Sequence, residues 1–404
     1  MEIPRVIIIH PYRQHSLQTA LALQNRGFLY KYITTVYLKK NSLSLLFASI
    51  APLGIRKKFL KHKLDGLDDS NIILFCQTKM LLLSLASMFL SSESVLKYHN
   101  KIIEEFNQKC LLYCLKQDFD ILISFDTLSG NIFSKLKAKG VKLVLDMSAP
   151  CFLEMYDIFK KDVQKYPNES KILENYLDSS KVFGNINKCS EEIVLYDYFL
   201  SASTFTTESL VKHGVNSDKI FLVRYGLTQI KSLKKIYHNN FTCTFVGSVT
   251  QQKGCHYIFR IAKKFPDLIF NLIGSYDYSY DGNIPSNCIL HGYLSFIDIQ
   301  NIFKRTDLFL FLSLADGFGF AATEAMAYGI PVVCSKNAGV RDYVIGSGWV
   351  IDYEDSKELS KIINWCLTNP DELNKRGLLA KSKVTNVTWK QYAQAISECL
   401  LNIR

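Results

Sequence analysis

The sequence has no run of apolar residues long enough to cross a membrane. Its longest apolar run, residues 80–90, falls well short of the roughly 20 residues that a membrane-spanning helix needs, and it predicts a buried helix instead. The N-terminus enters a strand-like pattern at once and lacks the charged, apolar and small-residue sections of a signal peptide. These absences lead us to expect a cytoplasmic protein.

Metal-binding and disulfide patterns are also absent from the sequence. The 11 cysteines form neither a C-x-x-C pair nor a Cys/His cluster with the spacing of a zinc site. Their odd number and apolar surroundings predict reduced thiols, as in a cytoplasm. A hydrophobic content of 48% excludes a mainly disordered chain, and 404 residues are enough for two domains.

Positive charge is concentrated near the N-terminus. The net charge is +11, and residues 1–100 hold more than twice as many Lys and Arg as Asp and Glu. Basic residues surround the apolar residues 43–55; they are Lys39, Lys40, Arg56, Lys57, Lys58, Lys61 and Lys63. Two interpretations fit this pattern: a solvated basic surface, or a surface that attaches to the inner face of an anionic membrane. Nucleic acid is not expected as a partner, because no zinc-finger, RNP or basic-zipper pattern occurs. The sequence does not predict an oligomeric state.

Strand-like and helix-like segments alternate through most of the chain. Residues 5–10, 120–125 and 142–146 have the continuous apolar character of buried parallel strands. A polar, basic segment, residues 226–240, precedes a second set of alternating elements. The pattern predicts an α/β protein with two Rossmann-like, doubly wound domains. We expect these domains at residues 1–226 and 227–387, with residues 388–404 forming a C-terminal helix that is a candidate to cross back to the first domain.

Residues 311–344 contain the most informative local pattern, a strand followed by a glycine turn and a helix. The turn is Gly317-Phe318-Gly319-Phe320, and the carboxylates of Asp316 and Glu324 flank it. Unpaired N–H groups at a helix N-terminus bind phosphate, and glycines allow it to approach closely. Asp316 can accept sugar hydroxyls and Glu324 a vicinal diol such as ribose, although both also fit ordinary acids at a helix start. The segment therefore predicts a sugar-nucleotide site.

This segment resembles the retaining glycosyltransferases of family 4, the "group 1" class with the GT-B fold. Residues that stand in register with the family signature are Ser313, Gly317, Phe318, Gly319, Glu324, Ala325, Met326, Ala327, Gly329, Pro331, Val332 and Val333. The first acid of the E-x7-E motif is Asp316 in this chain, which keeps the charge and shortens the side chain by one methylene. The resemblance is strong over residues 200–350. It implies two domains that face a central cleft.

The resemblance extends to residues 247–254, GSVTQQKG, where the family has G-R-x-x-x-x-K-G. In the family the arginine and the lysine of this pattern hold the donor diphosphate. The resemblance therefore implies that role for Lys253, whereas Ser248 stands at the position of the arginine. Arg224, Arg341 or backbone amides are candidates to compensate. Donor-binding residues implied by the resemblance are Gly247, Ser248, Lys253, His291, Gly292, Tyr293, Asp316, Gly317, Phe318, Gly319, Phe320, Ala321 and Glu324.

The likeness is weaker in the N-terminal half, where relatives carry a glycine-rich turn and a histidine that reaches the transferred sugar. This chain has Arg13 and His15 at the first place and Asp146 at the second. Arg13, His15 and Arg224 are candidates to bind phosphate or acceptor; Arg13 and His15 also fit ordinary loop residues. Asp146 is a candidate to accept a hydrogen bond from the donor sugar; alternatively it caps the segment that follows its strand. The D-x-D sequence at 118–120 fits a strand-entry turn, and the sequence shows no other metal-binding pattern. The resemblance implies helix dipoles and basic side chains in place of a metal, so we expect neither a metal nor another cofactor.

The resemblance implies transfer of a hexose-class sugar from a nucleotide diphosphate donor, with retention, to a hydroxyl of a glycan or lipid-linked acceptor. Asp146, Lys253 and Asp316 are the catalytic candidates, and the acceptor is expected on the N-terminal domain. Bacterial surface polysaccharide biosynthesis is the expected setting. Two alternatives stay open: a sugar-nucleotide epimerase with the same fold, and a non-catalytic binding protein, which the departures at Asp316 and Ser248 keep in view.

Overall fold

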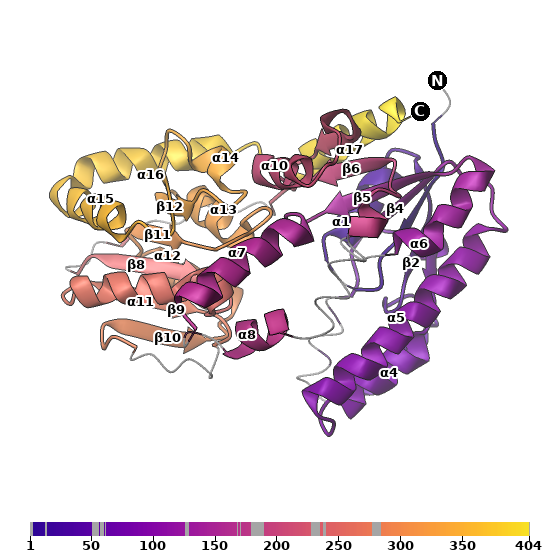
Figure 1. Ribbon diagram of the computed structural model, residues 1–404, viewed down its shortest axis with the longest axis horizontal. Helices are drawn as coiled ribbons and strands as arrows, with labels where there is room; N and C mark the ends of the chain where they lie inside the picture. Colours follow the sequence, from indigo (N-terminus) through magenta and orange to yellow (C-terminus); the bar gives the residue numbers. More distant parts are fainter. Residues whose placement is uncertain are drawn as a thin grey trace.

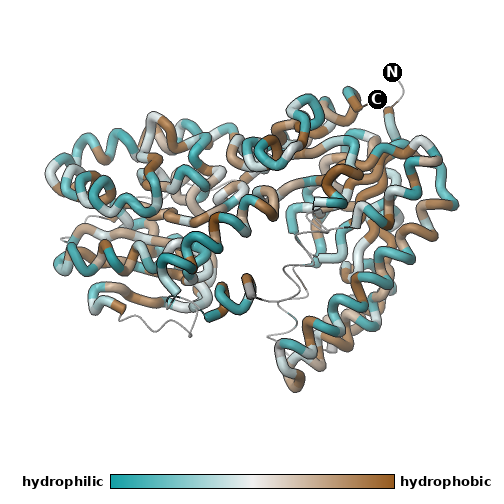
Figure 2. The backbone as a smooth tube through the Cα atoms, viewed as in Figure 1, coloured by the Kyte–Doolittle hydropathy of each residue, from teal (hydrophilic) through white to brown (hydrophobic). Residues whose placement is uncertain are grey.

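The computed structural model describes residues 3–12, 14–50, 56, 60, 62–125, 129–167, 169, 171–178, 190–227, 235–236, 240–276 and 284–403. Two parallel β-sheets, each flanked by helices, lie side by side (Figure 1). Hydrophobic residues recur along the strands and on the packed sides of the helices (Figure 2). The predicted fold class is confirmed: both halves are α/β units with parallel sheets.

The first sheet has seven strands in the order β3-β2-β1-β4-β5-β6-β7, and every described pairing is parallel. The strands are β1 (Val6–Ile9), β2 (Leu29–Thr34), β3 (Ile72–Leu74), β4 (Ile121–Phe125), β5 (Lys142–Met147), β6 (Tyr198–Ser201) and β7 (Ile220–Leu222). The strand order reverses between β1 and β4. Ligands of such sheets bind beyond the carboxyl ends of the strands at this reversal.

The second sheet has six strands in the order β10-β9-β8-β11-β12-β13, again with parallel pairings. They are β8 (Thr242–Val246), β9 (Ile269–Ile273), β10 (Cys288–Gly292), β11 (Leu308–Phe311), β12 (Val332–Ser335) and β13 (Trp349–Ile351). The order reverses between β8 and β11. The glycine turn at 317–320 follows β11, so it lies at the expected ligand edge of this sheet.

Successive residues of the central strand β1 point to opposite faces of the first sheet. Val6 and Ile8 belong to one buried cluster, and Ile7 and Ile9 belong to the other. Helices of this half are α1 (Ser16–Gln24), α2 (Leu43–Ile50), α4 (Gln77–Ala86), α5 (Ser92–Cys114), α6 (Gly130–Phe133) and α10 (Thr204–Lys212). The α4–α5 pair projects from the body of the molecule as a helical hairpin (Figure 1).

The second half has one large buried cluster around its sheet. Its helices are α11 (Cys255–Lys264), α12 (Phe296–Phe303), α13 (Phe320–Ala327), α14 (Arg341–Val344), α15 (Ser356–Thr368) and α16 (Pro370–Val384). No described helix combines the length and the hydropathy that a membrane span requires. The described cysteines are all free thiols.

Two helical segments connect the halves. The helices α7 (Phe152–Lys165) and α8 (Lys171–Asp178) follow β5 in the chain. However, α7 packs Ile158 and Phe159, and α8 packs Leu173 and Leu177, into the core of the second half. The last helix, α17 (Trp389–Asn402), returns to the first half and packs on α1, where Thr19 and Tyr392 share a hydrogen bond of 2.7 Å. The boundaries at 226 and 387 stay predictions.

Candidate active site

A cleft of about 520 Å³ lies between the two halves. Its first wall consists of residues 14–15 and 148–150, which follow β1 and β5. Its second wall consists of Gly247, Lys253 and residues 315–321, which follow β8 and β11. The carboxyl ends of strands from both sheets thus meet at one cavity, as the sequence pattern predicted for a ligand site.

The glycine turn brings the two walls into contact. A Cβ atom on Gly317 would overlap the carbonyl oxygen of Ser148 and lie 2.9 Å from the Cα of Ala149. Gly319 has a φ of 81°, a left-handed conformation that favours glycine, and it caps α13. Phe320 begins that helix and lines the cleft. The N-terminus of α13, with its unpaired N–H groups, therefore faces the cavity.

Lys253 and Asp316 form an ion pair inside the cleft. The Lys253 Nζ lies 2.6 Å from Asp316 Oδ2, and the two side chains are 27% and 17% exposed. Asp316 Oδ1 accepts a hydrogen bond of 3.2 Å from the N–H of Phe318. These two contacts fix the Asp316 side chain against the glycine turn. They also place the Lys253 amine near the N-terminus of α13. A ligand with both phosphates and hydroxyls would meet the cation and the acid together.

Ser248 lies outside the described cleft lining. Its hydroxyl accepts a hydrogen bond of 3.1 Å from the Ser275 hydroxyl. The preceding Gly247 lines the cleft with a φ of 153°, and a Cβ there would lie 2.9 Å from the Phe245 ring. Among the described lining residues, Lys253 is therefore the one Lys or Arg side chain.

Glu324 lies one turn into α13 and is largely shielded from solvent. Burial raises the pKa of its carboxyl above the ordinary value. His291 Nε2–H donates a hydrogen bond of 2.8 Å to Asn271 Oδ1, and burial lowers the pKa of this histidine. Gly292 ends β10, and the Tyr293 side chain is exposed. These four residues belong to the second half but do not line the described cleft.

Asp146 ends up beneath the cleft instead of within its lining. It is 1% exposed, its Oδ1 accepts a hydrogen bond of 2.7 Å from the Tyr225 hydroxyl, and its Oδ2 lies 3.3 Å from His15 Nε2. His15 lines the cleft and packs its ring 4.0 Å from that of Tyr225. The contact of Asp146 with a ligand would therefore run through His15.

Tyr225 is a site residue that the sequence interpretation missed. Besides Asp146 and His15, its ring contacts Phe318 and stacks parallel to Phe320, with centroid distances of 5.5 and 5.9 Å. The tyrosine thus joins the first wall to the glycine turn of the second. The sequence offered one indication of this role: Tyr225 is an aromatic residue directly before the polar segment 226–240 that separates the two expected domains.

Beneath the first wall, His10 stabilises the start of α1. Its Nδ1 hydrogen-bonds Ser16 Oγ at 2.9 Å, and that hydroxyl in turn meets Tyr32 at 3.1 Å. Burial, reinforced by the nearby His15, lowers the pKa of His10 to about 3. His10 is therefore neutral at pH 7 and serves this turn as a hydrogen-bonding group, not as a charge.

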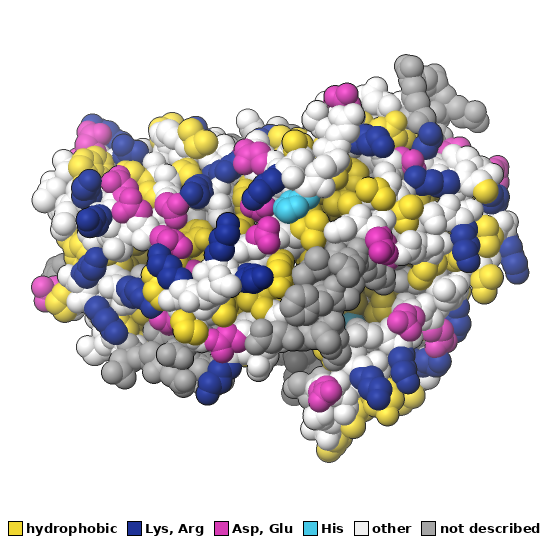
Figure 3. Space-filling model, viewed as in Figure 1, with side chains coloured by type: hydrophobic (Ala, Val, Ile, Leu, Met, Phe, Trp, Pro, Cys, Tyr) yellow, Lys and Arg dark blue, Asp and Glu magenta, His cyan; other side chains and the backbone are white. Residues whose placement is uncertain are grey.

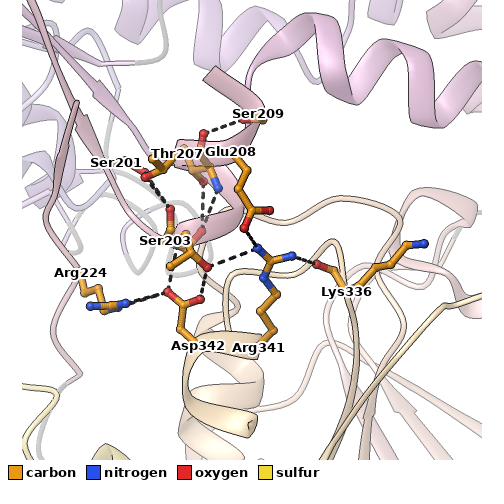
Figure 4. Close-up of polar contacts among 11 residues, drawn as sticks. Ser201, Ser203, Thr207, Glu208, Ser209, Arg224, Lys336, Arg341 and Asp342 are labelled. Carbon is orange, nitrogen blue, oxygen red and sulfur yellow. Dashed lines mark hydrogen bonds and ion pairs between the residues drawn. The ribbon is translucent and has the colours of Figure 1, made fainter. Parts of the chain in front are cut away.

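Arg224 and Arg341, the candidates to replace the missing arginine, lie in a polar cluster that joins the halves (Figure 4). Arg224 donates to Asp342 at 3.0 and 3.2 Å, and Arg341 pairs with Glu208. The backbone N–H of Thr204, at the start of α10, also donates to Asp342, at 3.0 Å. Both arginines are thus committed to carboxylates and lie outside the described cleft lining.

Two remaining sequence predictions concern a loop and a metal. Arg13 lies outside the described residues. Asp120 accepts a hydrogen bond of 2.7 Å from the backbone of Arg5, while the Asp118 side chain is fully exposed, as befits a strand-entry turn. Across the described ranges, no group of three or more His, Cys, Asp or Glu side chains is arranged to hold a metal ion.

Comparison with known sequences bears on the second half directly. A family model described as "Glycosyl transferases group 1" matches residues 228–382. This stretch is a glycosyl transferases group 1 domain. It contains the glycine turn, Lys253, Asp316 and Glu324, so the second wall of the cleft belongs to the group 1 domain.

Individual relatives share modest identity. The UDP-Gal:alpha-D-GlcNAc-diphosphoundecaprenol alpha-1,3-galactosyltransferase of Escherichia coli is 26% identical over 283 residues, 64% of each chain. The amylovoran biosynthesis glycosyltransferase AmsK of Erwinia amylovora is 26% identical over 189 residues, 41% of this chain and 46% of its own. The chain spans 64% of the length of the first of these relatives and 46% of the second, so it matches about half to two thirds of each.

Solved structures establish the fold over the whole chain. The sucrose-phosphate synthase of Thermosynechococcus elongatus superposes with a TM-score of 0.66 at 15% identity, covering 99% of this chain and 98% of that one. The predicted GT-B fold is confirmed. The resemblance to group 1 glycosyltransferases is confirmed for residues 228–382, which the family model matches. Membership of family 4 and the retaining stereochemistry remain predictions.

Proposed function

We propose that the protein is a retaining glycosyltransferase that moves a hexose-class sugar from a nucleotide diphosphate-sugar to a hydroxyl. The observation that carries the proposal is the cleft in which Lys253, paired with Asp316, sits at the N-terminus of α13 in the group 1 domain. A cation and a helix N-terminus bind a diphosphate, and a carboxylate orients a sugar.

Each part of the donor has a candidate partner in the cleft. The diphosphate would accept hydrogen bonds from the N–H groups at the start of α13 and from the Lys253 amine. Asp316 would orient the sugar by accepting hydrogen bonds from its hydroxyls. Glu324, on the same helix, would bind the ribose diol. The base would lie toward residues 291–293 on β10 and the loop after it. Donor binding requires Lys253 to divide its three N–H donors between Asp316 and the phosphate oxygens.

The transfer step places negative charge on the leaving diphosphate as the bond from the sugar C1 to the phosphate oxygen breaks. Preorganised donors at that oxygen lower the barrier most. Lys253 and the α13 amides supply them from one wall, and His15, held by Asp146 and Tyr225, approaches from the other. The acceptor oxygen bonds to C1 from the same face, and its proton passes to the leaving phosphate oxygen.

A lipid-linked or glycan acceptor on the N-terminal half, in bacterial surface polysaccharide biosynthesis, completes the proposal. Support comes from the two relatives named above, an alpha-1,3-galactosyltransferase that acts on a diphosphoundecaprenol-linked sugar and a glycosyltransferase of amylovoran biosynthesis. No cofactor or metal is part of the mechanism, because each proposed step is assigned to a side chain or a backbone amide.

Product analysis tests the proposed activity. Purified protein would be incubated with UDP-, GDP-, ADP- and dTDP-hexoses and a short-chain polyprenyl diphosphate-linked sugar, and the products would be followed by proton NMR. We expect a new glycoside with the anomeric configuration of the donor. A new sugar nucleotide without any acceptor would identify an epimerase, and donor binding without turnover would identify a non-catalytic binding protein.

The α4–α5 hairpin carries the surface that we propose for peripheral membrane attachment. The buried helix predicted for residues 80–90 is wrong in part, because α4 ends at Ala86 and, of these residues, only Leu81 and Leu83 are buried. Exposed apolar side chains at and near the tip of the hairpin are Leu82, Met88, Phe89, Leu90, Leu96 and Tyr98. Figure 3 shows apolar side chains along the lower edge of this hairpin with basic ones beside them. Phe89, at the tip, is 87% exposed. Lys79, Lys101 and Glu105 line a groove of about 500 Å³ between the two helices, and Lys79 is paired with Glu105. Apolar residues flanked by lysines suit an anionic bilayer.

Replacing Phe89 with glutamate is expected to reduce binding to vesicles that contain 30% phosphatidylglycerol by about tenfold, because a charge enters the apolar contact. Sedimentation with such vesicles, and with pure phosphatidylcholine, measures the effect. Ile345→Glu is the matched control, since Ile345 is 61% exposed on the opposite half. Equal loss in both variants, or no loss in either, contradicts attachment through the hairpin. The sequence had suggested a different surface, the basic residues around 43–55, of which Lys57, Lys58 and Lys61 lie outside the described residues.

A further inference from the structure

Helix α7 connects the two walls of the cleft. It begins just after residues 148–150, which form the first wall, and its Met155 also lines the cavity. Its buried face then passes over the second half, where Ile158 and Phe159 join the core of the group 1 domain. One end of the helix thus belongs to the first wall, and the other end reaches the segment that carries Lys253.

A buried carboxylate makes that second contact. Asp162 on α7 is 1% exposed, and its Oδ1 accepts a hydrogen bond of 2.7 Å from Gln251 Nε2. Its Oδ2 accepts one of 2.6 Å from the Tyr257 hydroxyl, and His256 Nε2 lies 3.3 Å from Oδ1. A buried carboxylate is costly unless its oxygens are hydrogen-bonded, so these partners are held in a fixed position. All three flank Lys253 in the chain.

The turn that carries Lys253 is held from its other side as well. The carbonyl oxygen of Gln252 accepts a hydrogen bond of 3.1 Å from the N–H of Leu314. Gly254 has a φ of 70°, and a Cβ there would overlap the carbonyl oxygen of Leu312. Gln251 therefore faces α7, Gln252 faces the end of β11, and Lys253 follows them into the cleft.

Further contacts join the end of α7 to α11. Gln251 Nε2 also lies 3.3 Å from the carbonyl oxygen of Tyr166, and the Arg260 guanidinium stacks 4.1 Å from the Tyr166 ring. Arg260 also pairs with Glu169. By contrast Glu154, near the start of the same helix, bonds to Lys212 and His213 on and after α10, within the first half. Helix α7 thus has two buried carboxylates: Glu154 binds side chains of the first half, and Asp162 binds side chains of the group 1 domain.

We propose that Asp162 is a positioning residue for the donor diphosphate: through Gln251 it fixes the turn that presents Lys253 and ties that turn to the opposite wall of the cleft. The inference rests on the proposed function, because Lys253 is the group it positions. Asp162 itself touches no substrate. Its effect on the donor should therefore disappear when the Lys253 amine is absent.

Calorimetric titration with UDP, GDP, ADP and dTDP tests this coupling. For the nucleotide that binds the wild type most tightly, Gln251→Met is expected to weaken binding about tenfold, since the side chain keeps its length but loses the donor to Asp162. In the Lys253→Met background the same substitution should change affinity less than about twofold. Tyr257→Phe, which removes the other hydrogen bond, is a second variant, with an expected loss of about threefold.

Lys212→Met is the matched control, because it removes a partner of Glu154 on the same helix without touching the Lys253 turn. Urea unfolding of all variants separates loss of stability from loss of binding. Unchanged affinity in Gln251→Met, an equal loss in Lys212→Met, or full additivity with Lys253→Met would overturn the positioning role. If none of the four nucleotides binds the wild type, the proposed function fails together with this inference, whereas the other outcomes leave the proposed function intact.

Discussion

Replacing Lys253 with methionine is expected to lower kcat/KM for sugar transfer by about 100- to 1,000-fold, the usual cost of removing one donor from a developing oxyanion. The amine lies 2.6 Å from Asp316 and, among the described residues that line the cleft, no other Lys or Arg side chain occurs. Methionine keeps most of the volume of the lysine side chain, so the loss of kcat/KM measures the effect of removing its charge. Steady-state kinetics with the preferred donor measure it.

Lys336→Met is a suitable control for this prediction. Lys336 also pairs with a carboxylate of the group 1 domain, Asp352, but at an exposed site away from the cleft. Its loss should leave kcat/KM within about twofold of the wild type, since exposed ion pairs contribute little. Wild-type activity in Lys253→Met would contradict the assignment of this lysine to the diphosphate.

Gly317→Ala is expected to lower kcat by about 100-fold while leaving donor affinity nearly intact. The added methyl group would overlap the carbonyl oxygen of Ser148, so the walls must separate, and a displacement near 1 Å costs about this factor. Donor contacts lie mainly within the group 1 domain and should survive. Separate determination of kcat and of nucleotide affinity distinguishes the two effects.

Gly329→Ala provides the comparison for Gly317→Ala. Gly329 has a φ of 78°, but an added Cβ would find its nearest atom, the Gly377 carbonyl oxygen, at 3.7 Å. Its replacement costs roughly 1–2 kcal/mol of backbone strain, which lowers stability without moving the walls. A wild-type kcat in Gly317→Ala would show that close contact of the walls is not required for transfer.

Most of the fold could be predicted from local patterns. Strands such as residues 142–146 and 242–246 can be recognised in the sequence as nearly continuous apolar runs, because parallel strands are buried on both faces. The position of α7 could not be predicted, because its sequence follows a strand of the first sheet while its apolar face packs on the second half. Amphipathicity indicates that a face is buried, but not against which neighbour.

The candidate site was predicted best where function and local structure coincide. The glycine turn specifies its own conformation, so residues 316–321 could be expected at one site with Lys253, and the structure places them along the same cleft. Asp146 was expected beside the sugar, and its burial under His15 follows from Tyr225, more than 70 residues away in sequence. Arg224 and Arg341 were proposed as phosphate ligands. In the structure Arg224 forms an ion pair with Asp342, and Arg341 forms one with Glu208. Such pairings depend on tertiary contacts that no local pattern encodes.

Ligand-induced stabilisation tests the central claim, a nucleotide diphosphate site at Lys253 and α13, most directly. Thermal unfolding would be followed for the wild type and for Lys253→Met with UDP, GDP, ADP and dTDP. At 100 times its Kd, a nucleotide stabilises the native state by about 2.7 kcal/mol, which raises Tm by several degrees. We predict such a shift with at least one nucleotide for the wild type and a much smaller shift for Lys253→Met. No shift with any of the four, or equal shifts in both proteins, would contradict the account.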